Sequence, residues 1–113
     1  MLKLENRLKH EKDFDLVYKK GKSVFDKVAG VKFKPNNLEY SRFAIVVGLK
    51  VSKKAVERNR IKRQYREIIR LNLDKITPGY DIIVLTSKEV MTANYDGMQK
   101  GLLAVLKRAK LLA

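Results

Sequence analysis

The sequence predicts one α/β domain, an α+β sandwich in which helices pack on a single β-sheet, with its elements in the order αββαβα. The chain has 113 residues, a length typical of one domain, so residues 1–113 are expected to fold as a single unit. Hydrophobic residues make up 45% of it, which favours a globular chain over a disordered basic tail. Segments of alternating apolar residues follow segments whose apolar residues recur at helical spacing, which predicts a mixture of strands and helices.

The first half of the chain predicts one helix and two strands. Residues 13–20 predict a short helix that Gly21 ends. Residues 23–34 alternate loosely and predict a strand, and Pro-Asn-Asn at 35–37 predicts a turn. Residues 41–51 predict a stronger strand, because every second residue is apolar. The apolar residues on one face of that strand are Phe43, Ile45, Val47, Leu49 and Val51.

The second half predicts two helices and one strand between them. The basic segment described next predicts the first helix, and Thr-Pro-Gly at 77–79 breaks the chain after it. Residues 80–86 are almost wholly apolar, as is typical of a strand at the centre of a sheet. Residues 92–109 predict the last helix, in which Gly97 and Gly101 are expected to permit close packing. Its apolar face comprises Met98, Leu102, Val105, Leu106 and Ala109.

The most informative segment is the basic run at 52–70, SKKAVERNRIKRQYREIIR. It holds eight Lys or Arg and two acids, a net +6 of the chain's +14. We expect a helix from Lys53 or Lys54 to about Leu73, with Ser52 as its cap. At about 100° per residue the cations gather opposite an apolar arc. That arc comprises Ile61, Tyr65, Ile68, Ile69 and Asn72.

This arrangement suits a helix that packs on one side and binds a phosphate backbone with the other. Arg carries planar, permanently charged donors that match phosphate oxygens. A run of like charge is ordinarily just a solvated face. Here the cations have almost no acid partners within the segment, which favours a polyanionic partner. The net charge of +14 and the pI near 10.1 agree, because such charge becomes favourable when counterions leave a nucleic acid.

The residue content argues against several other classes of protein. The chain has no cysteine, which excludes disulfides and thiolate chemistry and fits a reducing cytoplasm. The single histidine, His10, lies among charged residues, so no Ser-His-Asp set can be assembled. The scattered acids predict no metal site within the protein, and no phosphate-binding glycine loop is present. The apolar runs 43–47 and 82–85 are too short for a bilayer, so we expect a soluble cytoplasmic protein without catalytic side chains.

The basic segment resembles the signature of the bacterial ribonuclease P protein component, an Arg-Asn-Arg core followed by spaced Lys and Arg on a helix. Many members carry a short insertion after Lys-Lys, whereas here Lys54 joins Ala55 directly. The resemblance covers nearly the whole chain. It rests on residues 51–54 (VSKK), 55–63 (AVERNRIKR) and 66–67 (RE), and also on 6–9 (NRLK), 13–14, 17–18, Gly21, 41–51 and 80–84.

The resemblance implies a function that composition alone does not show. Ribonuclease P removes the 5′ leader of precursor tRNA, and in bacteria its catalytic subunit is an RNA that uses Mg²⁺. The resemblance implies one protein bound to each catalytic RNA and contacting the leader of precursor tRNA. It also implies that Mg²⁺ serves the RNA-containing enzyme, with no metal held by the protein alone. For the fold, it implies a left-handed crossover between parallel strands, against the usual handedness.

Two sets of binding residues follow from the resemblance and the helical wheel. Arg58, Asn59, Lys62 and Arg66 lie nearest the apolar arc, whereas Arg60 and Arg63 project further out. The set expected to bind the catalytic RNA comprises Lys53, Lys54, Arg60, Lys62, Arg63, Arg66 and Arg70. The set expected to bind the leader comprises Phe14, Tyr18, Lys32, Arg58, Asn59, Lys62 and Arg66.

The aromatic members of the leader set have two interpretations. Phe14 and Tyr18 are four residues apart and could be ordinary core residues of a short helix. The resemblance instead places them on the wall of the leader cleft, where a base stacks on a ring without sequence selection. We expect Tyr18 to be partly exposed and leave Phe14 as core or cleft. Lys32 is expected to contact the RNA backbone, with Phe33 on the opposite face.

Three alternative functions stay open at this point. A general RNA-binding or ribosomal protein would share the charge and the fold but lack a leader site. A membrane-surface protein could use the last helix, whose apolar face is flanked by Lys100, Lys107, Arg108 and Lys110. A stand-alone nuclease would cleave RNA without an RNA subunit.

Overall fold

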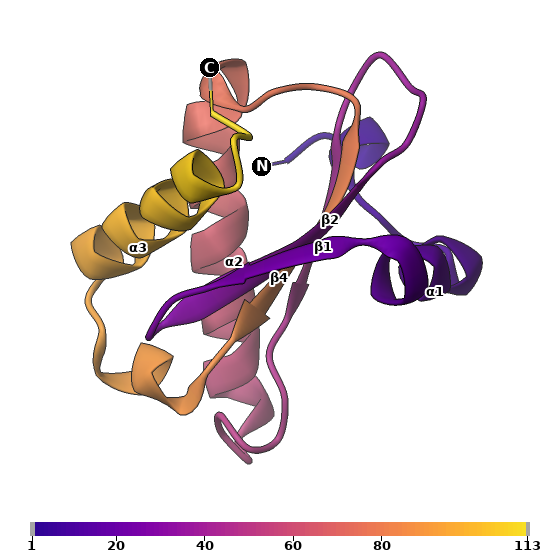
Figure 1. Cartoon of the computed structure of the whole chain (residues 1–113). Helices are drawn as coiled ribbons and strands as arrows, with labels where there is room; N and C mark the ends of the chain where they lie inside the picture. The colour runs from indigo at the N-terminus through magenta and orange to yellow at the C-terminus, as the bar shows by residue number, and fades with distance from the viewer. Residues whose placement is uncertain (1, 113) are drawn as a thin grey trace.

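A four-stranded mixed sheet lies between helices in the structure, a computed structural model that describes residues 2–112 (Figure 1). Its helices and strands follow the predicted order, with one additional strand, so the predicted α/β fold class is confirmed. Short 3₁₀ helices lie at Leu4–Asn6, Leu73–Lys75 and Lys88–Thr92. The main elements are α1 (Glu11–Lys20), β1 (Lys22–Phe25), β2 (Ala29–Pro35), β3 (Arg42–Val46), α2 (Ala55–Asn72), β4 (Tyr80–Thr86) and α3 (Tyr95–Arg108).

The strands lie in the order β1-β2-β4-β3. Strand β2 is antiparallel to both of its neighbours, whereas β3 and β4 are parallel and are joined through α2. Strand β4 therefore occupies an interior position, as its apolar sequence predicts. The left hand of the β3–α2–β4 crossover, which the resemblance implies, stays a prediction.

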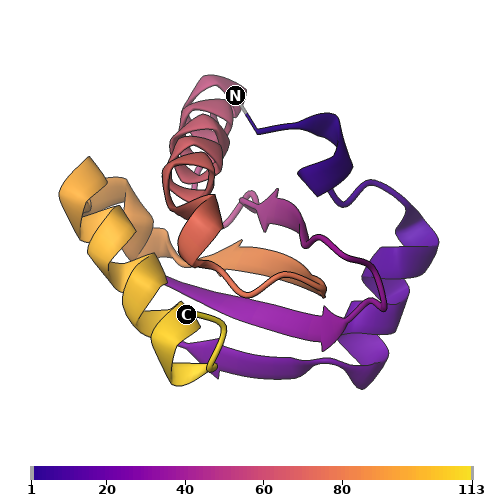
Figure 2. The same cartoon turned by 90° about the horizontal axis from the view of Figure 1, so that it is seen from above.

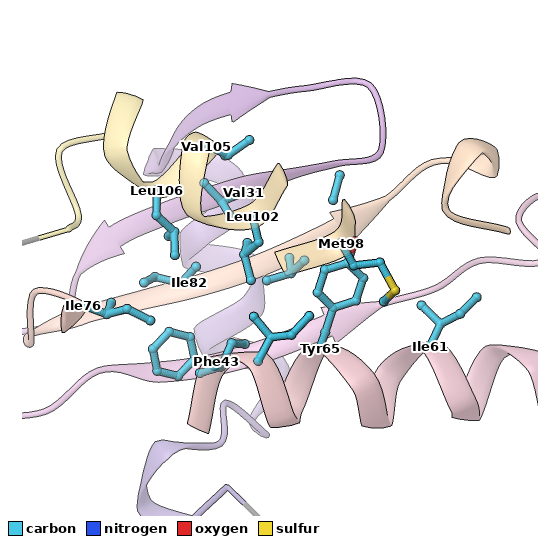
Figure 3. Close-up of a cluster of buried hydrophobic side chains, with 14 of the residues drawn as sticks. Val31, Phe43, Ile61, Tyr65, Ile76, Ile82, Met98, Leu102, Val105 and Leu106 are labelled. Carbon is cyan, nitrogen blue, oxygen red and sulfur yellow. The ribbon is translucent and has the colours of Figure 1, made fainter. Parts of the chain in front are cut away.

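The helices lie on both faces of the sheet (Figure 2). Helices α2 and α3 cover one face, where side chains such as Tyr65, Ile82 and Leu102 form the larger hydrophobic core (Figure 3). Helix α1 covers part of the other face, where Val17 packs with Leu8 and Ile83 in a smaller core. Because side chains alternate along each strand, both faces of the sheet are apolar beneath the helices.

The strand predicted at 23–34 is in fact a hairpin of β1 and β2. A tight turn at 26–28 separates them, in which the Asp26 side chain accepts a hydrogen bond from the Lys27 N–H at 2.7 Å. The Asp26 N–H in turn donates to the Ala29 carbonyl at 3.0 Å. The prediction failed because this turn contains neither glycine nor proline, and apolar residues continue on both sides of it.

The strand predicted at 41–51 ends early, at Val46. The chain turns at Gly48, where the Val51 N–H donates to the Gly48 carbonyl at 3.0 Å. Val47 and Val51 are buried, but Leu49 is 68% exposed and does not share their surroundings. The alternating apolar residues at 47–51 therefore belong to a turn and not to the predicted strand.

Both long helices begin later than predicted. Helix α2 begins at Ala55, and Ser52 lies outside it. The Ser52 hydroxyl accepts from the Lys54 N–H at 3.1 Å and donates to Glu57 at 2.6 Å, so it shapes the turn before the helix.

Helix α3 begins at Tyr95 because Asn94 caps it, accepting a hydrogen bond from the Gly97 N–H at 2.7 Å. The close packing predicted at Gly101 is wrong, since a Cβ there would meet no atom within 4 Å. A Cβ on Gly97 would approach the Asn94 side chain of the cap, 3.1 Å away, rather than another element.

Candidate nucleic-acid interface

Helix α2 buries the apolar arc predicted from its periodicity. Ile61, Tyr65, Ile68, Ile69 and Asn72 are all buried against the sheet and α3. The Asn72 amide is satisfied, because it donates to the Ile68 carbonyl at 2.7 Å. The Tyr65 hydroxyl has no hydrogen-bond partner among the described residues. Burial raises the pKa of Tyr65 to about 12.

The opposite side of α2 carries cations that are mostly free of acid partners. Arg60, Arg63 and Arg66 are exposed, whereas Lys62 is half-buried. Arg70 forms the one salt bridge of the basic run among residues 2–112, donating to Glu67 at 2.5 and 3.0 Å. This pairing lowers the pKa of Glu67, mainly through the hydrogen bonds from Arg70. The remaining guanidinium and ammonium groups are available to phosphates, although Arg58 also donates to the Ser52 carbonyl at 2.9 Å.

The N-terminal segment, residues 2–9, lies beside these cations. The Leu8 N–H donates to the Phe43 carbonyl at 2.8 Å, which pairs the segment with the outer edge of β3. The Arg7 side chain donates to the Leu2 carbonyl at 3.1 Å, so the segment folds back on itself. The pairing with β3 places Arg7 and Lys9 on the same side of the molecule as α2, although they are distant from α2 in the sequence.

Two adjoining hollows lie between the N-terminal segment, α2 and β3. One, of about 480 Å³, is lined by Asn59, Arg63 and Arg66 at successive turns of α2. The other, of about 290 Å³, reaches Phe14 of α1. Both are lined by Leu2, Arg7 and Arg66, so we treat them as one basic groove. Its lining residues are Leu2, Arg7, Leu8, Lys9, Phe14, Phe43, Ala44, Ile45, Asn59, Arg63, Arg66 and Glu67.

The aromatic residues of α1 differ in exposure. Tyr18 is 44% exposed, as predicted, whereas Val17 beside it is buried. Phe14 is half-buried, and it both packs against the smaller core and lines the basic groove. The Lys32 ammonium lies 5.6 Å from the centroid of the Tyr18 ring, a cation–π contact. Phe33 is buried on the opposite face of β2.

The structure brings some of the predicted site residues together and separates others. Phe14 and Arg66 share the groove, and Tyr18 lies with Lys32. Arg63, expected to project outward, lines the groove because the N-terminal segment lies beside it. The groove lining does not include the other cations of the two predicted sets, namely Lys53, Lys54, Arg58, Arg60, Lys62 and Arg70.

Sequence reasoning assigned no role to Arg7 and Lys9. They belong to the Asn-Arg-Leu-Lys stretch at 6–9, which carries part of the family resemblance. The available signal was the alternation of Arg7, Leu8 and Lys9. Such alternation predicts a segment that packs through its leucine and presents its two cations on the other side.

Two features that residues 2–112 lack bear on other kinds of site. No helix in this part of the chain is both long enough and apolar enough to cross a membrane. No group of three or more His, Cys, Asp or Glu within the same residues is placed to hold a metal ion.

Comparison with known proteins gives concordant matches. A family model described as Ribonuclease P matches residues 2–110. The ribonuclease P protein component of Fusobacterium nucleatum is 40% identical over 111 residues, covering 95% of this chain and 99% of that protein. The structure of the RNase P protein from Thermotoga maritima matches with a TM-score of 0.83 and 40% identity, over 90% of this chain and 96% of that one. A Staphylococcus aureus RNase P protein mutant, described as defective in mRNA degradation activity, matches with a TM-score of 0.88 and 34% identity, over 95% and 90% of the two chains.

Proposed function

Because the chain belongs to the family of bacterial ribonuclease P protein components, we propose that it binds the catalytic RNA of ribonuclease P and the 5′ leader of precursor tRNA together. Membership makes it a protein subunit of ribonuclease P, and so a part of the tRNA-processing machinery. The contacts with each RNA, and the division of the work between protein and RNA, are our proposals.

The observation that carries the proposal is the basic groove beside the exposed cations of α2. Arg63 and Arg66 of α2 line it together with Arg7, and these three guanidinium groups make no salt bridge among residues 2–112. Mutual repulsion makes such a cluster unfavourable until a polyanion enters. Phosphate oxygens match guanidinium donors in geometry and charge, so a nucleic-acid backbone is the partner that best fits the groove.

We assign the two RNAs to neighbouring parts of this surface. The catalytic RNA would contact the outer side and the start of α2, including Arg60, Lys53 and Lys54, all of which are exposed. The leader would pass from Arg66 along Phe14 toward Tyr18 and Lys32 on the α1 side of the sheet. Arg66 lies where the two paths meet, which supports its membership of both predicted sets. As the family resemblance implies, we propose one protein per catalytic RNA.

In this proposal the RNA carries the catalysis and Mg²⁺ belongs to the RNA part of the enzyme. We assign no step of the reaction to a protein-bound ion, since no group of three or more His, Cys, Asp or Glu among residues 2–112 is placed to hold one. The protein's cations would instead reduce the repulsion between two polyanions and replace part of the condensed counterions. We therefore expect the protein to lower the Mg²⁺ concentration that the catalytic RNA needs.

The test is cleavage of precursor tRNA by a bacterial catalytic RNA at low Mg²⁺, with and without the protein. We expect cleavage at the mature 5′ end to be faster with the protein, and precursor tRNA to bind the complex more tightly than mature tRNA. Equal affinity for the two tRNAs would favour a general RNA-binding protein. A rate that the protein leaves unchanged at every Mg²⁺ concentration would refute the proposal.

A control with protein alone tests the alternative that the polypeptide is itself a nuclease. The S. aureus relative is a mutant with defective mRNA degradation activity, so messenger RNA belongs in this control beside precursor tRNA. We expect both RNAs to stay intact when no catalytic RNA is added. Mg²⁺-dependent cleavage by the purified protein would instead assign catalysis to the polypeptide.

A further inference from the structure

A second exposed aromatic residue lies on the same face of the sheet as Tyr18. Phe25, at the end of β1, is 55% exposed. It pairs with Gly30 of β2, which pairs with Leu85 of β4, which pairs with Val46 of β3. Paired residues point to one face of a sheet, and Leu85 and Val46 pack with the smaller core on the α1 side. The Phe25 ring therefore lies on the α1 face.

Gly30 makes room for this ring. A Cβ on Gly30 would lie 2.2 Å from Cδ1 of Phe25, so the ring occupies the space that a larger residue at position 30 would fill. An aromatic side chain that covers a glycine on the neighbouring strand is a recognised way to stabilise such a pair. The Arg108 side chain also donates to the Phe25 carbonyl, which fixes the end of β1 from α3. The ring is thus held in place although much of it faces solvent.

Helix α1 leaves this end of the face open. The helix lies at the end of the sheet opposite the turn between β1 and β2 (Figures 1 and 2). It is tied there by an ion pair between Asp13 and Arg42 at the start of β3. The row that contains Phe25 is the row farthest from that ion pair, which agrees with the exposure of the ring.

Lys32 lies between the two exposed rings. It pairs with Ser23 and with Ile83, so it occupies the next row of the same face, one strand repeat of about 6.6 Å from the Phe25 row. On its other side its ammonium contacts the Tyr18 ring. The α1 face therefore presents an aromatic ring, a cation and a second aromatic ring in sequence. This alternation is what a single-stranded nucleic acid needs for its bases and its phosphates.

We propose that Phe25 is a base-stacking residue for the single-stranded leader, beyond Tyr18 along its path, with Lys32 contacting the phosphate between the two bases. This inference rests on the proposed function and extends it, because the predicted leader set ends at Tyr18 and Lys32. RNA suits this surface better than a second copy of the chain does. The hairpin 22–35 carries four Lys and one Asp, so two copies meeting here would repel each other.

The test measures affinity of the reconstituted RNA–protein enzyme for precursor tRNAs whose leaders grow one nucleotide at a time, with mature tRNA as reference. Phe25→Ala should weaken binding about fivefold or more, corresponding to the lower end of a single base–aromatic contact. The loss should appear only once the leader is long enough to pass Tyr18 and Lys32. Phe25→Tyr should bind like the wild type, because it keeps the ring.

Two further variants separate stacking from packing. Phe25→Leu keeps an apolar cover over Gly30 but lacks a ring, so it should lose the same affinity as Phe25→Ala. Gly30→Ala should displace the Phe25 ring and cause the same leader-dependent loss, with the fold retained as judged by circular dichroism. Tyr40→Ala is the matched control, since Tyr40 is an exposed aromatic residue in the segment before β3, at the other end of the sheet from the Phe25 row. It should bind every leader as the wild type does.

The outcomes that overturn the inference are distinct from failure of the proposed function. If leader nucleotides beyond Tyr18 and Lys32 add the same affinity in Phe25→Ala or Phe25→Leu as in the wild type, Phe25 does not stack on the leader. If sedimentation shows wild-type dimers at assay concentration that Phe25→Ala abolishes, the ring belongs to an interface between copies. If the wild type itself shows no leader preference, the proposed function and this inference fail together.

Discussion

Arg42 and Asp81 face each other across β3 and β4 and share two hydrogen bonds, from Nε to Oδ1 at 2.8 Å and from Nη2 to Oδ2 at 2.7 Å. The hydrogen bonds to Asp81 raise the pKa of Arg42, which keeps its guanidinium charged. The Arg42 guanidinium also contacts Asp13 of α1 at 3.3 Å. The helix that presents Phe14 and Tyr18 is therefore anchored to the sheet through Arg42.

Replacing Asp81 by Asn should destabilise the protein by about 2–3 kcal/mol. Loss of one partner from a fully buried pair costs about 3–5 kcal/mol, and we expect less here because the Arg42 side chain keeps 20% of its exposure. Urea unfolding monitored by circular dichroism measures the effect. Asp96→Asn is the control, since its salt bridge with Lys100 is exposed and should contribute about 0.5 kcal/mol or less. Equal losses in the two variants would contradict the role given to Asp81.

Tyr65→Phe should stabilise the protein by about 1 kcal/mol at neutral pH. The hydroxyl of Tyr65 is buried without a partner, and an unsatisfied buried polar group costs about 1–3 kcal/mol, part of which the lost packing offsets. Tyr65 lies in the core between α2 and the sheet, where Phe fits the same space (Figure 3). Chemical denaturation of the two proteins gives the difference directly, and a less stable variant would show that the hydroxyl has a partner.

The same residue should make stability depend on alkaline pH. The pKa of Tyr65 is about 12 in the folded protein and 10 for an ordinary tyrosine, so the unfolded chain loses its proton first. The contribution of Tyr65 protonation to the free energy of unfolding is complete below pH 10. It falls by about 1.4 kcal/mol per pH unit from pH 10 to pH 12. Lysines also titrate in this range, so the measured quantity is the difference between wild type and Tyr65→Phe. That difference should widen as pH rises, and a constant gap would contradict the prediction.

Arg60→Ala and Arg63→Ala should each weaken binding of the catalytic RNA and reduce its salt dependence. Each lost phosphate contact lowers the slope of log affinity against log salt by about 0.7–0.9. The melting temperature should hardly change, because both side chains are exposed. Lys100→Ala, an exposed cation of α3 that pairs with Asp96, should leave the slope unchanged. Unfolding of either arginine variant would mean that the assignment of faces on α2 is wrong.

Tyr18→Ala should weaken binding of long-leader precursor tRNA by about 1–3 kcal/mol, the range for one base stacked on one ring. Mature tRNA and substrates with very short leaders should bind normally. Because Tyr18 is 44% exposed while Val17 fills the core, stability should change little. Affinity and melting temperature are measured on the same preparations. A lower melting temperature with equal losses for all substrates would leave Tyr18 as a packing residue.

Lys110→Gly should stabilise the protein by about 1 kcal/mol. Lys110 has a φ of 63°, a left-handed conformation that favours glycine, at the position where α3 ends. The Leu111 N–H closes the helix by donating to the Leu106 carbonyl at 2.8 Å, which needs that conformation. Lys107→Gly is the control, because Lys107 lies within the last turn of α3. This substitution should destabilise the protein by about 1 kcal/mol. Thermal unfolding of both variants should therefore shift in opposite directions.

Periodicity predicted the elements whose surroundings are uniform along their length. Strand β4 was predicted with its observed ends, because its central residues are buried on both faces of the sheet and are therefore continuously apolar. The apolar arc of α2 was predicted for the same reason. The predicted strand 23–34 was not, because one three-residue turn interrupts it. In an unbroken strand Phe25 would share a face with Ala29, Val31 and Phe33, whereas the turn places it on the opposite face.

The candidate site was predictable only where it lies within one element. The cations of α2 follow from a helical wheel. The basic groove does not, because it needs Arg7 and Lys9 from a segment that reaches β3 through a tertiary contact, the Leu8 to Phe43 hydrogen bond. The cation–π contact between Lys32 and Tyr18 likewise joins a strand to a helix. No sequence pattern within the helix or the strand predicts that these two side chains lie close together.

The pairing of the N-terminal segment with β3 has a practical consequence for handling the protein. Leu2 is 2% exposed, and the Asn6 amide donates to the Ser41 carbonyl at 2.8 Å, so the segment covers an otherwise free sheet edge of the kind that recruits other chains. An affinity tag fused ahead of Leu2 would start beside Arg7 and Arg63, where it could obstruct RNA or lift the segment and invite aggregation. Tags and immobilisation linkers therefore belong after Leu112, at the other end of the chain.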